Sequence, residues 1–308
     1  MANSKPASIV RKRYAKIDKA LKRVVPGFAP EDIHQFRLQV KKLRSYLGLV
    51  ATVKQKGIWL KLPTKLHQFY IAIGAVRNLQ LQQQRISPLF NERFSPVLTP
   101  YLHFISASMD NAVARAKKLA RRKKNFAKER DKLVKQLPSK LRPATSRKFI
   151  RHRIDKLKAL MQPSSLSDES LHFVRKLLKD ILYTWPYTTK KNSGIPEQEL
   201  MSREEIDSII KVLGSFRDKC EGLDLLHVHY KQQQSGSNQR LMWRRLENTW
   251  WHERELERVS IHHLFHKEFA LLLHAEQFHE HALPLPVKQL TLLKRSSSIK
   301  VLEDKPDK

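Results

Sequence analysis

One basic pattern, His-x-x-Arg-x-x-x-Lys, occurs twice in this chain, and the second copy begins 138 residues after the first. Each copy is followed by a second pattern, Gly-x-x-Arg-Asn or Gly-x-x-Arg-Asp, and the copies of that pattern are 140 residues apart. Two linked motifs at nearly the same offset indicate one structural unit used twice, with its function built on the repeat. The first set is His34, Arg37, Lys41, Gly74, Arg77 and Asn78, and the second is His172, Arg175, Lys179, Gly214, Arg217 and Asp218.

The spacing within the first pattern predicts an α-helix with one charged face. At about 100° per residue, its three members and Arg44 fall within an arc of roughly 80°. The flank beside that arc is apolar and consists of Ile33, Phe36, Val40, Leu43 and Leu47. The second copy has a similar flank, formed by Leu171, Val174, Leu178 and Ile181. Lys176 lies near the second charged face, but Leu182 stands where the first copy has Arg44, so the second face carries one charge fewer.

The charge balance predicts an anionic partner. The chain holds 60 Lys and Arg against 29 Asp and Glu, a formal net charge of +31. Such an excess costs stability through self-repulsion and is typical of proteins that bind a polyanion. It is N-terminal: residues 1–160 hold 38 basic and 8 acidic side chains, a net +30, whereas residues 161–308 hold 22 and 21, a net +1. Nucleic acid, an anionic membrane surface and inorganic polyphosphate are the candidate partners.

The remaining composition favours a soluble, cytoplasmic protein. The single cysteine, Cys220, excludes an intramolecular disulfide and fits a reducing compartment. The N-terminal sequence lacks the apolar run of a signal peptide. No run of about 18 apolar residues is present, so no transmembrane helix is expected.

Periodic segments separated by prolines predict an all-α chain, since no alternating strand pattern competes with them. Helices are expected at about 31–53 and 58–86, then as one long basic helix ending near residue 136, and further at about 145–161, 168–186, 200–230 and 238–281. Ser167 and Asp168 are the expected cap of the helix that carries the second basic pattern.

The segments IHQFRLQVKKLRSYLGL, LHFVRKLLKDILY and LGSFRD, with the Gly-x-x-Arg-Asn helix, resemble the conserved-histidine α-helical domain, the CHAD family. The resemblance implies two helical bundles of the four-helix type, related by pseudo-twofold symmetry around a basic central cavity that binds inorganic polyphosphate. Some members of the family associate with polyphosphate granules. The resemblance covers residues 25–290, in repeats of about 25–161 and 162–290, after a basic N-terminal helix or extension at 1–24 and before a frayed tail at 291–308.

The predicted polyphosphate-binding residues come from both motif pairs and from a basic stripe between them. For His34 and His172 a role in helix packing is an equal alternative. For Arg77 and Arg217 an internal ion pair is the alternative, because Asp218 follows Arg217 directly. The full set is His34, Arg37, Lys41, Lys42, Arg44, Arg77, Arg115, Lys118, Arg122, His172, Arg175, Lys176, Lys179 and Arg217.

Nucleic-acid binding is the main alternative function. Single-strand binders interleave basic residues with stacking aromatics, whereas Phe36 and Phe173 are expected on the apolar flanks, which favours phosphate without bases. A phosphate-hydrolysing enzyme would need clustered carboxylates to hold a divalent metal, and the first half has only 8 acidic residues. No P-loop, nucleophile elbow or dinucleotide fingerprint is present, so neither catalytic residues nor a cofactor are expected.

Two C-terminal clusters have competing interpretations. The pair His262 and His266 has the spacing of metal ligands on one helical face, but no Glu follows His262 in the His-Glu-x-x-His manner, so no metal site is predicted. The string Glu253, Glu255 and Glu257 is similar to the acidic ladder of triphosphate-hydrolysing tunnel enzymes. It lacks their lysine at the fifth place and falls in an expected helix, so it is not assigned to catalysis.

Overall fold

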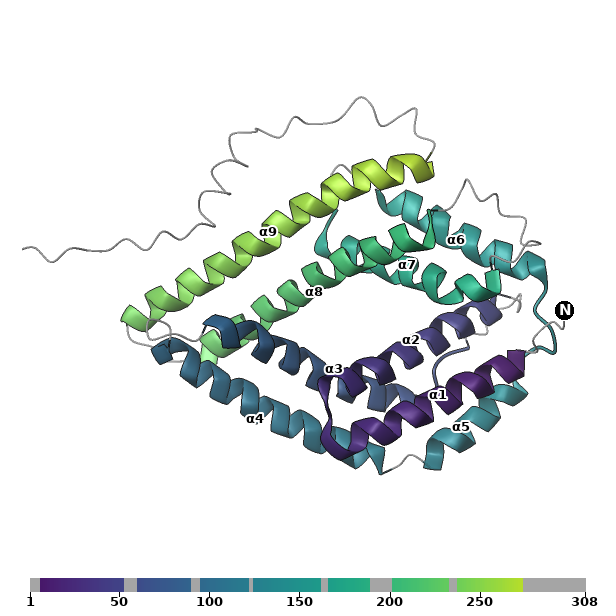
Figure 1. The fold of residues 1–308 in the computed structure, drawn as a ribbon, viewed down its shortest axis with the longest axis horizontal. Coiled ribbons are helices and arrows are strands. Elements are labelled where there is room, and N and C mark those ends of the chain that lie inside the picture. The colour runs from purple at the N-terminus through teal and green to yellow at the C-terminus, as the bar shows by residue number, and fades with distance from the viewer. Residues whose placement is uncertain are drawn as a thin grey trace, which may run out of the picture.

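The computed structural model describes residues 6–52, 60–89, 95–121, 124–161, 166–188, 201–232 and 237–273. Within these ranges all regular structure is helical, which confirms the all-α prediction (Figure 1). The helices are α1 (Pro6–Gly27), α2 (Pro30–Ala51), α3 (Thr64–Ile86), the 3₁₀ turn η1 (Ser87–Leu89), α4 (Ser95–Ala120), α5 (Lys124–Lys135), α6 (Pro143–Met161), α7 (Asp168–Thr188), α8 (Arg203–Gln232) and α9 (Ser237–Leu273).

Two helix boundaries differ from the sequence prediction. The helix expected at about 58–86 begins only at Thr64, because Pro63 precedes it as the N-cap and the residue before a proline is biased away from the helical conformation. The expected long basic helix is two helices, because α4 ends at Ala120 and α5 begins at Lys124. The change falls in a run of four consecutive cations at positions 121–124. Like charges so close together along one helix repel one another, and the run interrupts the apolar stripe that would hold a continuous helix to the core.

Side-chain caps fix the starts of the two helices that carry the second motif pair. At α7 the backbone N–H of Ser170 donates to Ser167 Oγ at 3.1 Å, which confirms the predicted cap. At α8 the N–H of Glu205 donates to Ser202 Oγ at 3.2 Å, and the N–H of Ser202 donates to Glu205 Oε2 at 2.7 Å. This reciprocal pair is a capping box, in which two otherwise unpaired N–H groups are satisfied.

The same order of helix packing occurs twice. In the first half α1 packs on α2, α2 on α3 and α3 on α4, and in the second half α6 packs on α7, α7 on α8 and α8 on α9 (Figure 1). α5 follows the first group and packs on α1 and α3. The packing groups α1 with α2 and α6 with α7. The repeat boundaries at about 25–161 and 162–290 stay a prediction. The predicted tail, 291–308, lies outside the described residues.

The two groups meet where α2 packs on α7 and α3 on α8. Ser45 Oγ donates to Asp180 Oδ1 at 2.7 Å across the α2–α7 contact. Across the α3–α8 contact the amide of Gln82 donates to the carbonyl oxygen of Gly222 at 3.3 Å. Residues 82 and 222 are 140 positions apart, the offset of the second motif, so equivalent positions of the two repeats touch each other. A twofold relation between the repeats, which stays a prediction, would produce such a contact.

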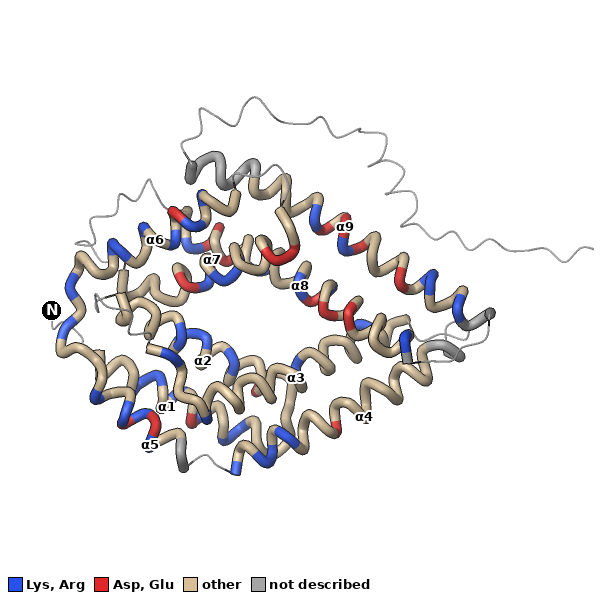
Figure 2. The backbone as a smooth tube through the Cα atoms, turned by 180° about the vertical axis from the view of Figure 1, so that it is seen from behind, with Lys and Arg blue, Asp and Glu red and all other residues tan. Residues whose placement is uncertain are grey.

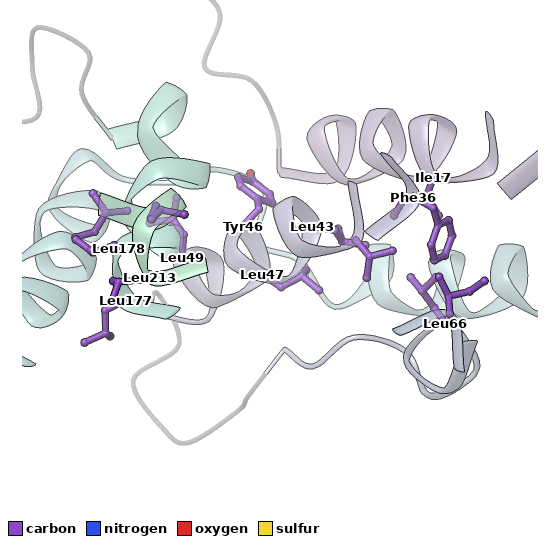
Figure 3. Close-up of a cluster of buried hydrophobic side chains, with 14 of the residues drawn as sticks. Ile17, Phe36, Leu43, Tyr46, Leu47, Leu49, Leu66, Leu177, Leu178 and Leu213 are labelled. Carbon is purple, nitrogen blue, oxygen red and sulfur yellow. The ribbon is translucent and has the colours of Figure 1, made fainter. Parts of the chain in front are cut away.

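A continuous apolar core joins the two groups. Its buried side chains come from α2, with Phe36, Leu43 and Leu47, and equally from α7 and α8, with Leu178 and Leu213 (Figure 3). The apolar flanks predicted for the motif helices are buried as expected. Each such side chain contributes about 1.5–3 kcal/mol by leaving water, so the motif helices are held firmly while their charged faces stay free of the core. A smaller cluster around Trp250 joins α3, α4, α8 and α9.

Candidate functional site

The charged faces of α2 and α7 meet at a pair of equivalent lysines. Lys179 is only 8% exposed, and burial together with the positive charges of Lys41 and Arg175 lowers its pKa to about 6. Burial, Arg37, Arg175 and Arg44 likewise lower the pKa of Lys41 to about 7. Burial disfavours the charged form of a lysine most strongly here, and the neighbouring cations disfavour it further. The repeat thus concentrates positive charge at the α2–α7 contact.

In each repeat, the glycine of the Gly-x-x-Arg pattern makes room for the arginine of the His-x-x-Arg-x-x-x-Lys pattern. A Cβ atom at position 74 would overlap Nη1 of Arg37, and a Cβ at position 214 would lie 3.0 Å from Nη2 of Arg175. The guanidinium of Arg37 is fixed further, because Nη1 donates to the carbonyl oxygen of Tyr70 at 3.3 Å and Cζ lies 4.7 Å from the centroid of the Tyr70 ring. The two sequence motifs are therefore two halves of one contact, made once in each repeat.

One carboxylate lies among these cations. Asp218 is close enough to Lys41, Arg175 and Lys179 to oppose the lowering of their pKa values. Arg217 forms its ion pair with Glu221, where Nε donates to Oε1 at 2.9 Å, and not with the adjacent Asp218 that the sequence suggests. Helical geometry favours this pair, since residues four apart share a face of the helix. Asp218 instead faces the charges of α2 and α7.

The two histidines differ in their surroundings. His172 is half-buried, and burial with the charges of Lys176, Arg217 and Arg175 lowers its pKa to about 4. It is therefore neutral at pH 7, and its Nδ1 atom is buried without a hydrogen-bond partner among the described residues. His34 lies on the exposed side of α2. The partial desolvation of its ring by the surrounding protein lowers its pKa, and the negative charge of Glu31 opposes this change.

Most of the predicted residues gather around the lysine pair. Arg44 on α2 adds to the charge on both lysines, and Arg77 on α3 lies near His34 and Asp218. Lys176 and Arg217 lie beside His172, and Lys176 is exposed. We call the following set the central cluster: His34, Arg37, Lys41, Arg44, Arg77, His172, Arg175, Lys176, Lys179 and Arg217.

Three of the predicted residues lie away from the central cluster, and a fourth is outside the described residues. Lys42 projects from another side of α2 and has Arg13, Lys16 and Arg203 as its charged neighbours. Arg115 and Lys118 are exposed on α4, which lies on the outer side of α3 (Figure 1). Arg122 lies outside the described residues.

Three residues near the central cluster are missing from the sequence prediction. Tyr70 lies under Arg37, Tyr183 lies beside Arg175, and Glu221 pairs with Arg217. Burial raises the pKa of Tyr183 to about 12, so its hydroxyl keeps its proton. Only Glu221 has a sequence signal, its spacing of four from Arg217. The tyrosines lie outside the basic pattern, and nothing in their own spacing marks them.

Charge is distributed unevenly over the helices. Lys and Arg recur along α1, α2 and α5, whereas Asp and Glu are concentrated on α8 and α9 (Figure 2). On α9, Glu253 pairs with Arg85 and Glu257 with Lys219, while Glu255 pairs with Arg254 and Arg258. The acidic string singled out in the sequence thus lies on a helix, and its members take part in ion pairs.

In the ranges that the structure describes, no three or more His, Cys, Asp and Glu side chains are grouped to hold a metal ion. His262 and His266, the pair with metal-ligand spacing, both belong to α9. None of the helices described combines the length and the apolar character needed to cross a bilayer.

Comparison with known proteins identifies relatives of this architecture. The family model described as CHAD domain matches residues 8–227. The crystal structure of the CHAD domain from the plant Ricinus communis is similar at a TM-score of 0.61 and 18% identity, over 85% of this chain and 90% of that chain. PptA from Streptomyces chartreusis is similar at a TM-score of 0.65 and 14% identity, over 85% of this chain and 98% of that chain. A comparison with curated protein sequences gives no match.

Proposed function

Because this chain belongs to the CHAD domain family, we propose that it binds inorganic polyphosphate at the central cluster without chemically changing it. The bound chain would lie in a cavity between the faces of α2, α3, α7 and α8. Its phosphates would be held by guanidinium forks and by ammonium groups acting as point charges.

The crowding of cations around Lys41 and Lys179 is the observation that supports this function. Both lysines have pKa values lowered toward neutrality, and other cations contribute to each shift. Such an arrangement is unfavourable in the free protein, and Asp218 offsets only part of the repulsion. A polymer with about one negative charge per phosphate would supply the missing counter-charge and release its own counterions.

Polyphosphate is favoured over nucleic acid because the side chains described around Lys41 and Lys179 are mainly cations, which bind phosphate, whereas single-strand binders also use aromatic rings on which bases stack. One face of the Tyr70 ring is covered by Arg37, and Phe36 is fully buried as predicted. Phe173, however, is 40% exposed, which corrects the expectation that it lies on the buried flank. Phe173 is exposed because it follows the motif histidine His172 and lies between the charged face and the apolar stripe of the helix. The binding experiment therefore includes single-stranded DNA.

Binding without catalysis is part of the same proposal. Two carboxylates of α8 in this site are engaged with cations, since Glu221 pairs with Arg217 and Asp218 faces Arg175 and the two lysines. Carboxylates held in this way stabilise the cations around them rather than offering free ligands to a divalent metal. We further propose a cytoplasmic location, with association to polyphosphate granules following from the affinity itself.

A direct binding comparison tests the function. Long-chain polyphosphate and single-stranded DNA of matched charge are titrated at two salt concentrations, while free phosphate is monitored. We expect tighter binding of polyphosphate at both, with an affinity that falls steeply with salt as counterion release requires. Equal affinity for the two polymers would contradict specific polyphosphate binding. Release of phosphate would make the protein an enzyme.

A further inference from the structure

A second group of cations lies on another side of α2. Its members come from three helices: Arg13 and Lys16 from α1, Lys42 from α2 and Arg203 from the start of α8. Lys16 and Arg203 are exposed, and Arg13 and Lys42 are half-buried. We call these four residues the second cluster.

Hydrogen bonds position the second cluster. Arg13 Nη1 donates to Gln39 Oε1 at 3.4 Å, and Nη2 donates to the Tyr187 hydroxyl at 3.1 Å. Lys16 follows Arg13 by three residues and Lys42 follows Gln39 by three, so each lies on the same helical face as its neighbour. The Arg13–Gln39 contact therefore sets the face of α1 that carries Lys16 against the face of α2 that carries Lys42.

The charge of the second cluster is not neutralised by the protein. Both hydrogen-bond acceptors of Arg13 are neutral, an amide and a phenol. Among the ion pairs between described residues, none includes Arg13, Lys16, Lys42 or Arg203. Burial lowers the pKa of Lys42, and the charged neighbours that lower it further are all cations. Positive charge gathered from three helices without an ion pair between described residues is suited to an anionic ligand.

The two clusters share α2 as a common wall. Lys41 belongs to the central cluster and Lys42 to the second, and consecutive residues of a helix point about 100° apart. A helix with its side chains is about 10 Å wide, so two clusters on different sides of α2 are separated by a distance that a flexible polymer of many units can span. A ligand of a few units has no such reach.

We propose that the second cluster is an additional contact for the same polyphosphate chain, so that long chains engage both clusters at once and short chains only the central one. This inference rests on the proposed function and adds a dependence on chain length to it. Once a chain is held at the central cluster, its second contact forms at a high effective concentration and raises the affinity without any change at the first.

Charge removal at the second cluster tests the idea. The triple variant Lys16→Gln, Lys42→Gln and Arg203→Gln keeps Arg13 and its hydrogen bonds. The matched control, Lys128→Gln, Lys156→Gln and Lys231→Gln, removes the same charge from exposed lysines of α5, α6 and α8. Binding is measured with tripolyphosphate as the short probe and with polyphosphate of about a hundred units as the long one. Circular dichroism verifies that both variants fold.

The expected result is selective. The second-cluster variant should bind the long chain at least roughly fivefold more weakly than the control does, with a smaller salt dependence, because about three phosphate contacts are lost. Its affinity for tripolyphosphate should stay within about twofold of the control. Equal long-chain affinity in the two variants, or an equal loss for both probes, would overturn the second contact and leave the proposed function standing. If the unaltered protein bound no polyphosphate at all, the proposed function itself would fail.

Discussion

At the scale of single residues, the central cluster depends on the absence of two side chains. Gly74 and Gly214 lie against the guanidinium groups of Arg37 and Arg175, so neither position has room for a methyl group without a shift of the arginine. The far end of an arginine side chain can move at little cost. A larger residue at either position would therefore displace a charge and leave the helix intact.

Gly74→Ala provides the test at this scale. Alanine is the better helix former, by about 1 kcal/mol, so the melting temperature should not fall. Arg37 should lose its place beside Tyr70, and polyphosphate affinity should drop roughly tenfold, the value of one charge-assisted contact. Isothermal titration and thermal unfolding measure the two effects.

Gly48→Ala is the matched control for that change. A Cβ at position 48 would lie 3.7 Å from Arg153 Nη2 and from the Phe149 ring, an ordinary contact. We expect unchanged affinity in this variant. If Gly74→Ala bound polyphosphate as well as Gly48→Ala does, Arg37 would not depend on the space at position 74.

At the scale of elements, α2 and α7 differ in how much of their charge is already balanced. The second repeat has Asp218 beside Arg175 and Glu221 paired with Arg217. Asn78 and Leu81 stand 140 residues before these two carboxylates, so the first repeat has no equivalent. α2 also has Arg44 where α7 has Leu182, which packs against the core. The α2 face therefore has more charge available for an external anion.

Two triple variants compare the faces directly. Replacing Arg37, Lys41 and Arg44 with glutamine should weaken polyphosphate binding roughly tenfold more than replacing Arg175, Lys176 and Lys179 does. The reason is that carboxylates already balance part of the charge of the second repeat, so its removal costs less of the attraction to the ligand. Both triples remove the same formal charge, so each serves as the control for the other. Equal losses would show that the difference in charge balance between the repeats does not affect binding.

The sequence predicts elements well and their partners less well. The helix ranges and buried flanks follow from apolar periodicity, which packing reinforces. The break between α4 and α5 depends on local repulsion that competes with helix continuation. The Glu221 partner of Arg217 and the separate direction of Lys42 follow from helical angles once those are applied residue by residue. The surroundings of Tyr70 and Tyr183 depend on which helices meet, which no local pattern determines.

At the scale of the whole molecule, the cluster links binding to proton uptake. The free protein has lowered pKa values at Lys179, about 6, and at Lys41, about 7, against an ordinary value of 10.5. At these two lysines the unfolded chain therefore binds more protons than the folded one between about pH 6 and about pH 10, so their contribution makes the free protein more stable as the pH rises through that range. A bound polyanion favours the charged amines and returns their pKa values toward the ordinary one.

Polyphosphate affinity should consequently increase as the pH falls from about 8 to about 6, with about two protons taken up per binding event at pH 8. Titration calorimetry in buffers of different ionisation enthalpy counts these protons. Lys179→Met removes one titrating amine of similar length, and uptake should fall by about one proton. An affinity and a proton count that do not vary over this range would show that the lysines are not neutralised by the ligand.

The contact between Gln82 and Gly222 has a consequence for how such a molecule arises. In a pair of identical subunits, equivalent positions that touch must hold the same residue, so a glutamine would face a glutamine. Here the two positions differ, and a Cβ at 222 would come within 2.7 Å of Gln82 Oε1. When both repeats are part of one polypeptide, each position can change independently. The first repeat can then have the large side chain of Gln82 while the second has a glycine, Gly222, opposite it. Under the predicted twofold relation, a single polypeptide thus permits an interface that no symmetric assembly of a single gene product could have.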